Sequence, residues 1–173
     1  MGIIKSVRGF SPKMGKNCYL ADNATIIGDV EMGDDCSIWF GAVLRGDVNP
    51  IRIGNRVNIQ DNCTVHTTFN DSVVEIGDDV TVGHNVVIHG ARIESHALIG
   101  IGSVLLDHVV VGSNTIVAAG SVVLEKSILK PNSLYAGIPA KRIKTVDPKR
   151  VESMIKRIAK DYKMYAGWYK EEE

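Results

Sequence analysis

The chain has 173 residues, with 20 basic and 20 acidic side chains that cancel at pH 7. This length supports one domain with a sizeable core, and the balanced charge gives no indication of a nucleic-acid partner. No stretch approaches the ~18 apolar residues of a membrane span, and the N-terminus lacks a signal-peptide pattern. Three cysteines form an odd set, which argues against a disulfide framework and favours a reducing compartment. We therefore expect a cytoplasmic protein without a membrane partner.

A six-residue repeat organises the chain from residue 18 to residue 134. Residues 1–17 precede it, and we expect them to form an N-terminal cap over an otherwise open sheet edge. The repeat is interrupted by three extra residues near Asn49, by an insertion at 67–73 and by one deletion before Ile93. Its eighteen aliphatic anchors are Leu20, Ile26, Met32, Ile38, Leu44, Ile53, Ile59, Val65, Ile76, Val82, Ile88, Ile93, Ile99, Leu105, Val111, Val117, Val123 and Leu129.

Each repeat unit predicts a short strand followed by a turn. A small, β-branched or Cys residue stands two positions before the anchor, so both side chains point to the same side of an extended strand. Gly often follows the anchor, and we expect the chain to bend there. A sandwich of short strands is the alternative, but its turn signals are spaced irregularly, roughly 8 to 12 residues apart. The regular register instead favours an all-β solenoid, a parallel β-helix.

The repeat ends near residue 134, and residues 135–147 are expected to be a connector. Asp147 followed by Pro148 predicts a helix start, with the Asp as N-cap. An apolar stripe at helical spacing then predicts one amphipathic α-helix over 148–169. We expect this stripe to pack on the chain's own solenoid or on a neighbour's. The stripe consists of Val151, Ile155, Ile158, Tyr162 and Tyr165.

Through these units the chain resembles the hexapeptide-repeat proteins. The resemblance implies a left-handed coil with three units per turn, a hand that opposes the usual crossover rule. Eighteen units then make about six coils, and every third anchor lies on the same face.

Three histidines are the candidate metal ligands. The residues that follow the fifth, eighth and eleventh anchors are Arg45, His66 and His89, so these three stack at one corner. Two imidazoles about 4.8 Å apart can share a metal through bonds of about 2.0 Å. His84 belongs to the previous face and lies about 16 Å of extended chain from His89. If all three bind one ion, His84 comes from the next subunit, which predicts a cyclic homotrimer with three interfacial sites.

Polar residues near these positions complete the predicted site. Asp61 lies one coil from His84 on the same face, with Gln60 beside it, and a carboxylate and an amide there could hold a water or orient a substrate. Arg45 and Asp47 have two interpretations, as a structural ion pair across the interface or as an anion anchor.

Four segments carry a closer resemblance: Arg45-Gly46-Asp47, Asn58-Ile59-Gln60-Asp61-Asn62, Val65-His66 and Val82-Gly83-His84-Asn85-Val86-Val87-Ile88-His89-Gly90. They are similar to the γ-class carbonic anhydrase-like family, over nearly the whole chain. The resemblance implies a homotrimer with Zn²⁺, or Fe²⁺ or Co²⁺, bound by the three histidines at each interface. It also implies an interfacial salt bridge between Arg45 and Asp47, and contacts from Gln60 and Asp61 to the metal-bound water. Tyr135, on a late coil, is a further candidate for approaching the site.

The implied reaction is the reversible hydration of CO₂ to bicarbonate by metal-bound hydroxide, the activity of a carbonate dehydratase-like lyase. In the best-studied type of this family, glutamates after the Arg-Gly-Asp and on an acidic loop assist proton release. Here Val48 and Asn49 follow Asp47, and the loop at 67–72 has no glutamate, so we expect slow turnover. Two alternatives stay open: a hexapeptide-repeat acyltransferase with one His as general base, and an inactive trimer that the metal only staples together.

Overall fold

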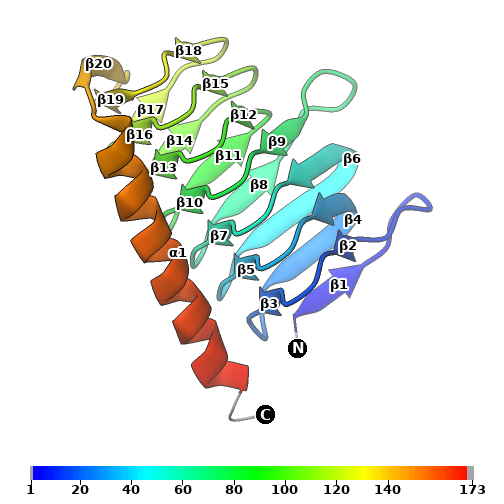
Figure 1. The fold of residues 1–173 in the computed structure, drawn as a ribbon. Helices are drawn as coiled ribbons and strands as arrows, with labels where there is room; N and C mark the ends of the chain where they lie inside the picture. The colour runs from blue at the N-terminus through cyan, green and yellow to red at the C-terminus, as the bar shows by residue number, and fades with distance from the viewer. Residues whose placement is uncertain (1, 171–173) are drawn as a thin grey trace.

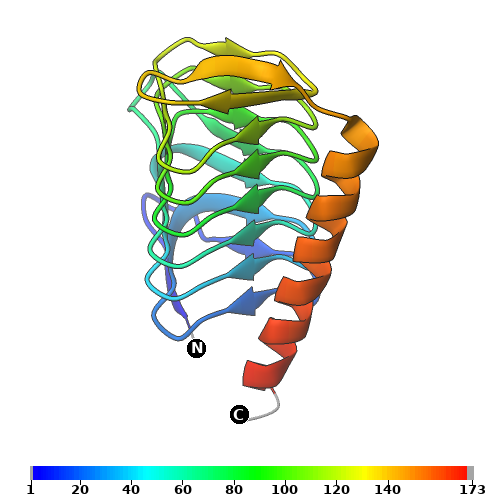
Figure 2. The same cartoon turned by 90° about the vertical axis from the view of Figure 1, so that its left-hand side faces the viewer.

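The repeat units form short parallel strands that stack in three columns, one for each side of a prism (Figures 1 and 2). The computed structural model describes residues 2–170, so Met1 and residues 171–173 lie outside it. Val65 pairs with Ile88, and Ile88 with Leu105, so each anchor stacks on the anchor three units later. This pairing confirms the parallel β-solenoid of hexapeptide units. In the part of the chain described, a single helix follows the solenoid at its C-terminal end, as predicted.

Two long strands, β4 (Thr25–Met32) and β6 (Val43–Ile53), run through a corner and contribute to two columns each. The first column also contains β1 (Ile3–Lys5), β8 (Thr64–His66), β11 (Val87–His89), β14 (Val104–Leu105) and β17 (Val122–Val123). The second column also contains β2 (Lys13–Met14), β9 (Val74–Ile76), β12 (Arg92–Ile93), β15 (Val110–Val111) and β18 (Ile128–Leu129). The third column is β3 (Tyr19–Leu20), β5 (Ser37–Ile38), β7 (Asn58–Ile59), β10 (Thr81–Val82), β13 (Leu98–Ile99), β16 (Ile116–Val117) and β19 (Ser133–Ala136).

The described chain makes about seven coils, where the anchors predicted about six, because each column holds seven parallel strands. The difference arises at the two ends. Within the segment expected as a cap, β1 and β2 both pair in parallel with β4. At the other end, β19 continues the third column, and β20 (Lys141–Thr145) pairs antiparallel with it. The segment expected as a connector therefore contributes the edge strand of this sheet.

The anchors face the interior and the residues that follow them face outward, as strand alternation requires. In the first column, Val65 and Ile88 are fully buried. His66 and His89, one position later, are only partly buried. Burying each such Val or Ile side chain stabilises the fold by about 1.5–3 kcal/mol. The aliphatic interior thus holds the outward-facing residues of successive coils in register.

The bends lie three positions before the anchors. The prediction that the chain bends at the glycine after each anchor is wrong. The backbone has a φ of 68° at Gly102 and 57° at Asp35, and most other bend residues are also Gly, Asn or Asp. These residues tolerate the left-handed conformation at low cost. The glycines after the anchors serve another purpose, since a Cβ on Gly100 would lie 2.5 Å from the backbone nitrogen of Ala119 in the next coil. They permit close stacking of the coils.

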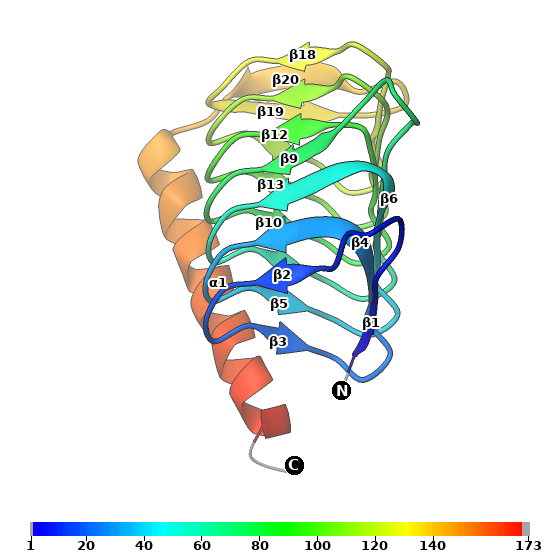
Figure 3. The same ribbon diagram turned by 90° about the vertical axis from the view of Figure 1, so that its right-hand side faces the viewer.

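Helix α1 (Pro148–Lys170) runs back along the third column towards the N-terminal end of the solenoid (Figures 1 and 3). Asp147 caps it, because its Oδ1 accepts a hydrogen bond from the Lys149 backbone nitrogen at 3.1 Å. Ile155 is fully buried, and the ring of Trp39 meets that of Tyr162 edge to face at 5.2 Å. The helix therefore packs on its own solenoid. Within residues 2–170, no helix has the length and apolar character to cross a membrane.

Candidate metal centre

His66 and His89 lie side by side on the outer surface of the first column. They are register partners at the ends of β8 and β11, and their ring centroids are 5.4 Å apart. Nδ1 of His66 faces Nε2 of His89 at 3.4 Å. The predicted stacking of these two residues at one corner therefore occurs within a single chain.

An aspartate holds the far side of each of these rings. Nε2 of His66 lies 3.1 Å from Oδ1 of Asp47, and Nδ1 of His89 lies 3.0 Å from Oδ2 of Asp107. An ionised carboxylate accepts a hydrogen bond, so the nitrogen beside it carries the ring proton in a neutral imidazole. The two nitrogens that face each other are then both unprotonated. Each histidine is thus prepared to donate a lone pair to the space between the rings.

The geometry of this pair fits a tetrahedral metal ion. Metal–nitrogen bonds of about 2.0–2.1 Å place two ligand nitrogens about 3.4 Å apart in a tetrahedral site. The observed nitrogen separation of 3.4 Å agrees with this value. Burial lowers the pKa of His66 despite its bond to Asp47, which favours the neutral ring that metals bind. Two facing lone pairs repel each other, so a proton or a metal ion between the two nitrogens would stabilise this arrangement.

One described chain does not complete the site. Among residues 2–170, no group of three His, Cys, Asp or Glu side chains is arranged to hold a metal. A structural metal needs about four ligands, and a catalytic one needs about three with an open position. Two histidines therefore require at least one ligand from elsewhere.

His84 lies apart from the pair and repeats its chemistry. It follows β10 in the third column, and its Nδ1 lies 2.7 Å from Oδ2 of Asp61. Its Nε2 faces the hydroxyl of Tyr162 on α1 at 3.4 Å. As with the other two histidines, a carboxylate occupies one ring nitrogen, and here the Tyr162 hydroxyl faces the other. Asp61 is thus brought to His84, as predicted from their shared column.

Arg45 and Asp47 form an ion pair within the chain. Nη1 of Arg45 donates to Oδ2 of Asp47 at 2.5 Å. Although desolvation opposes ionisation, the hydrogen bonds from Arg45 and His66 hold the pKa of Asp47 below its usual value. Asp47 therefore remains a carboxylate and keeps the His66 ring in place.

The other two candidates have different positions. Gln60 is buried beside Asp61, and its amide donates to Oδ1 of Asn58 at 3.1 Å. Tyr135 lies in β19, three strands beyond β10 in the third column, and its hydroxyl accepts a bond from the Lys130 backbone nitrogen at 2.9 Å. The structure thus places Gln60 near the His84 turn and Tyr135 in the last coil.

Two residues at this centre were not predicted, Asp107 and Tyr162. Asp107 lies 18 residues after His89, in a coil that the deletion before Ile93 shortens to 17 residues, so it stands one position beyond the register partner of His89. The same-position alignment that matched Asp61 with His84 therefore could not have found it. Tyr162 was predicted only as part of the helix stripe, and its contact with His84 spans 78 residues of sequence. No local pattern could have indicated that contact.

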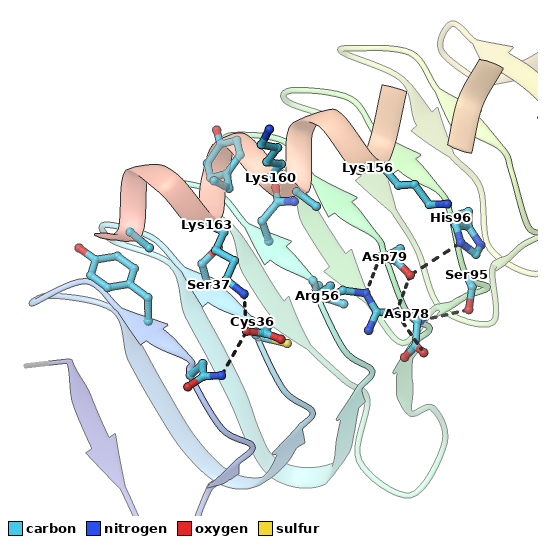
Figure 4. Close-up of a pocket in the computed structure, with 18 of the residues that line it drawn as sticks. Cys36, Ser37, Arg56, Asp78, Asp79, Ser95, His96, Lys156, Lys160 and Lys163 are labelled. Atoms are coloured by element: carbon cyan, nitrogen blue, oxygen red, sulfur yellow. Dashed lines mark hydrogen bonds and ion pairs between the residues drawn. The ribbon is translucent and has the colours of Figure 1, made fainter. Parts of the chain in front are cut away.

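A separate cavity of about 810 Å³ lies beneath α1 (Figure 4). Charged side chains on its wall pair with one another: Arg56 makes two 2.7 Å bonds to Asp79, and Lys163 lies 3.1 Å from Asp35. Tyr162 borders this cavity, and its hydroxyl also faces His84. The histidine pair lies outside it.

The chain is similar to a set of known proteins over most of its length. A family model described as bacterial transferase hexapeptide, six repeats, matches residues 11–46 and 90–125. A carbonic anhydrase from Geobacillus kaustophilus is 45% identical over 168 residues, which are 97% of this chain and 91% of that protein. The mitochondrial gamma carbonic anhydrase 2 of Arabidopsis thaliana is 43% identical over 88% of this chain, which spans 56% of the plant protein.

Two solved structures share the whole fold. A Bacillus cereus protein, provisionally classed as an acetyltransferase, is 39% identical with a TM-score of 0.92 and 99% coverage of both chains. A hexapeptide transferase family protein from Anaplasma phagocytophilum is 36% identical, with a TM-score of 0.88 and coverage of 96% of this chain and 98% of its own.

The fold and the family model together define a hexapeptide-repeat protein. The sequence identity to the carbonic anhydrase from Geobacillus kaustophilus defines a narrower family, because it extends over nearly the whole chain. The chain belongs to the γ-class carbonic anhydrase-like family of hexapeptide-repeat proteins, whose named members imply a metal cofactor.

Proposed function

We propose that this protein is a metal-dependent carbonic anhydrase that hydrates CO₂ to bicarbonate. The observation that carries the proposal is the separation of 3.4 Å between Nδ1 of His66 and Nε2 of His89, with a carboxylate behind each ring. Three imidazoles suit Zn²⁺, with Fe²⁺ and Co²⁺ as alternatives. The kinship with carbonic anhydrases supports the reaction.

The third ligand in this proposal is His84 of an adjacent subunit in a homotrimer. His84 has a carboxylate on Nδ1, as the other two histidines have on one ring nitrogen, and its Nε2, which the Tyr162 hydroxyl faces at 3.4 Å, would be the ligand atom. Its position on another column prevents it from joining His66 and His89 of its own chain. A cyclic trimer repeats one interface three times and would create three equivalent sites.

The metal, when bound by three imidazoles, supplies a hydroxide nucleophile near neutral pH. With this chemistry, hydration of CO₂ would give bicarbonate and one proton, which must reach solvent. Asp47, Asp61 and Asp107 fix the three imidazoles by accepting their remaining ring protons. We assign Gln60, buried next to Asp61, to orienting the substrate.

Proton release is the step that we expect to limit turnover. The insertion loop at 67–73 carries one acidic residue, Asp71, and its carboxylate lies 3.0 Å from Nε2 of His108. Asp47 and Asp107 are engaged by the histidines and hold pKa values below the usual range. Such carboxylates are poor proton carriers near pH 7. A small external buffer base should therefore increase the rate.

The direct test is stopped-flow CO₂ hydration with metal-free protein and with protein restored with Zn²⁺ or, under reducing conditions, Fe²⁺. We expect activity only after metal is restored, and a rate that rises with the concentration of an imidazole buffer. Fully metal-loaded protein that hydrates CO₂ no faster than buffer would contradict the proposal and would leave the metal as a structural staple.

An acyltransferase is the second candidate, supported by the names given to the two solved structures that share the fold. That chemistry needs one general base, whereas here three histidines are each backed by an aspartate. Acetyl transfer from acetyl-coenzyme A to small amines or hydroxyl compounds, followed as free thiol release, tests this candidate. Transfer that survives metal removal would favour it over CO₂ hydration.

A further inference from the structure

Asp107 is the centre of a hydrogen-bond cluster that ends on His89. Its Oδ2 lies 3.0 Å from Nδ1 of His89 and accepts a bond from the Thr68 hydroxyl at 3.2 Å. Its Oδ1 accepts a bond from the Ser72 hydroxyl at 2.5 Å. The Ser72 hydroxyl also accepts a bond from the Thr68 backbone nitrogen at 2.9 Å. Both carboxylate oxygens are therefore occupied, and the side chain has a single well-supported orientation.

The donors to Asp107 come from a segment that interrupts the repeat. Thr68 and Ser72 belong to the insertion at 67–73, which leaves β8 directly after His66. The other insertion supports this loop, because the amide of Asn49 donates at 2.7 Å to the backbone carbonyls of both Thr68 and Ser72. The two insertions of the solenoid thus meet at one place, beside the histidine pair.

The packing at Gly90 shows how closely this cluster approaches the chain after His89. A Cβ at Gly90 would lie 2.2 Å from the Ser72 hydroxyl and in similar overlap with Asp107. Gly90 also has a φ of 61°, a conformation that glycine adopts without strain. The residue after the ligand therefore leaves room for the loop and the carboxylate to reach it.

We propose that Asp107, held by the Thr68 and Ser72 hydroxyls, acts as a positioning clamp that sets the tautomer and orientation of His89 before any metal arrives. The inference rests on the proposed function for its consequence, which is metal affinity. The same role belongs to Arg45 and Asp47 at His66, where the carboxylate is held by a guanidinium. At His89, the neutral hydroxyls of Thr68 and Ser72 hold the Asp107 carboxylate. The clamp therefore depends on the insertion that carries these two residues.

Asp107 holds His89 through its negative charge as well as its shape. Its oxygens accept bonds from the Thr68 and Ser72 hydroxyls and lie against Nδ1 of His89, so an acceptor is needed at both oxygens. An asparagine at this position would present an amide whose NH₂ group cannot accept the hydroxyl bonds. Asp107→Asn should therefore disrupt the clamp without creating a cavity.

The test measures two quantities in wild type, Asp107→Asn and Ser72→Ala. The first is the tautomer of His89 in metal-free protein, from ¹⁵N chemical shifts of the imidazole nitrogens. The second is zinc affinity, from competition with a chromophoric chelator. Asp71→Asn is the matched control, because it removes a nearby carboxylate–imidazole contact, with His108, outside the histidine pair.

We expect the wild-type His89 ring to carry its proton on Nδ1, and Asp107→Asn to mix the tautomers and weaken zinc binding by about 10–100-fold. Ser72→Ala should have a smaller effect in the same direction, and Asp71→Asn none. Unchanged tautomer and affinity within twofold in Asp107→Asn would overturn the clamp. Wild type that binds no zinc would contradict the proposed function instead, while the tautomer measurement would still decide on the clamp.

Discussion

Nδ1 of His66 and Nε2 of His89 face each other at 3.4 Å across two adjacent coils, and an aspartate holds the opposite side of each ring. In the proposed function, this relationship makes the two surface histidines a preformed half of the metal site. The third ligand proposed is a histidine of another subunit. The predictions below concern metal binding, the sharing of a site between subunits, the stability of the solenoid and the pH dependence of that stability.

Replacing His89 with alanine should abolish stoichiometric metal binding, because a single imidazole at this corner cannot hold the ion well. Elemental analysis of zinc-loaded, desalted protein should give about one ion per chain in wild type and less than about a tenth of that in His89→Ala. The control is His108→Asn, since His108 lies at a bend with a φ of 61° that asparagine tolerates. Equal zinc content in His89→Ala and wild type would exclude the histidine pair as ligands.

A site shared between subunits can be recognised by mixing two defective variants. His84→Ala retains the pair, and His89→Ala retains His84, so each homotrimer should lack complete sites. In randomly mixed trimers, about a quarter of the interfaces combine the intact halves and should recover zinc and hydration activity. Coexpression with different affinity tags isolates the mixed species. No recovery in verified mixed trimers would show that the three histidines do not share an interfacial ion.

Substitution of either of two glycines in one turn should destabilise the fold, but by different amounts and for different reasons. Gly100→Ala should destabilise the fold by about 3 kcal/mol, because its Cβ would meet the backbone of the next coil at 2.5 Å. Gly102 has open space within 4 Å but a φ of 68°. Gly102→Ala should therefore cost about 1 kcal/mol and Gly102→Asn less. Urea unfolding of the three variants measures this order, and equal losses at both positions would contradict it.

The bond between Arg56 and Asp79 predicts a stabilisation that is lost at acidic pH. The Arg56 guanidinium holds the pKa of Asp79 below its usual value, against desolvation. A carboxyl group with a lowered folded-state pKa stabilises the protein above about pH 4, and this contribution disappears as pH falls through the folded pKa. Asp79→Asn keeps a residue suited to the φ of 56° and removes the charge.

We expect Asp79→Asn to lower the unfolding free energy at pH 7 by about 1 kcal/mol, since Arg56 is half exposed and solvent screens the pair. The difference from wild type should shrink towards zero between pH 4 and pH 2, as measured by denaturant titrations at each pH. A difference that stays constant over this range would assign the loss to packing rather than to charge.

The regular part of the solenoid was predictable because its side chains have a local cause. An inward anchor every six residues determines which residues face the core, so the outward positions of His66 and His89 follow directly. The prediction failed where the same residue type has two physical uses. Glycine after the anchor looked like a bend, but it serves close stacking, and the bends use Asn, Asp and Gly three positions before the anchor. The first and last coils were missed for two different reasons. Ile4 pairs with Ile26 but is exposed and lies outside the six-residue spacing. Tyr135 keeps the spacing but puts an aromatic side chain where the other anchors are aliphatic.

The sequence by itself determined the parallel β-solenoid, the C-terminal helix and the alignment of His66 with His89, because these follow from a period of six residues and from alternation along a strand. Only the tertiary structure decided which ring nitrogens face each other, that Asp107 and two loop hydroxyls support His89, and that Tyr162 reaches His84. Those relationships join residues from different coils, an insertion and the helix. They depend on the path of the chain in space, which no local periodicity encodes.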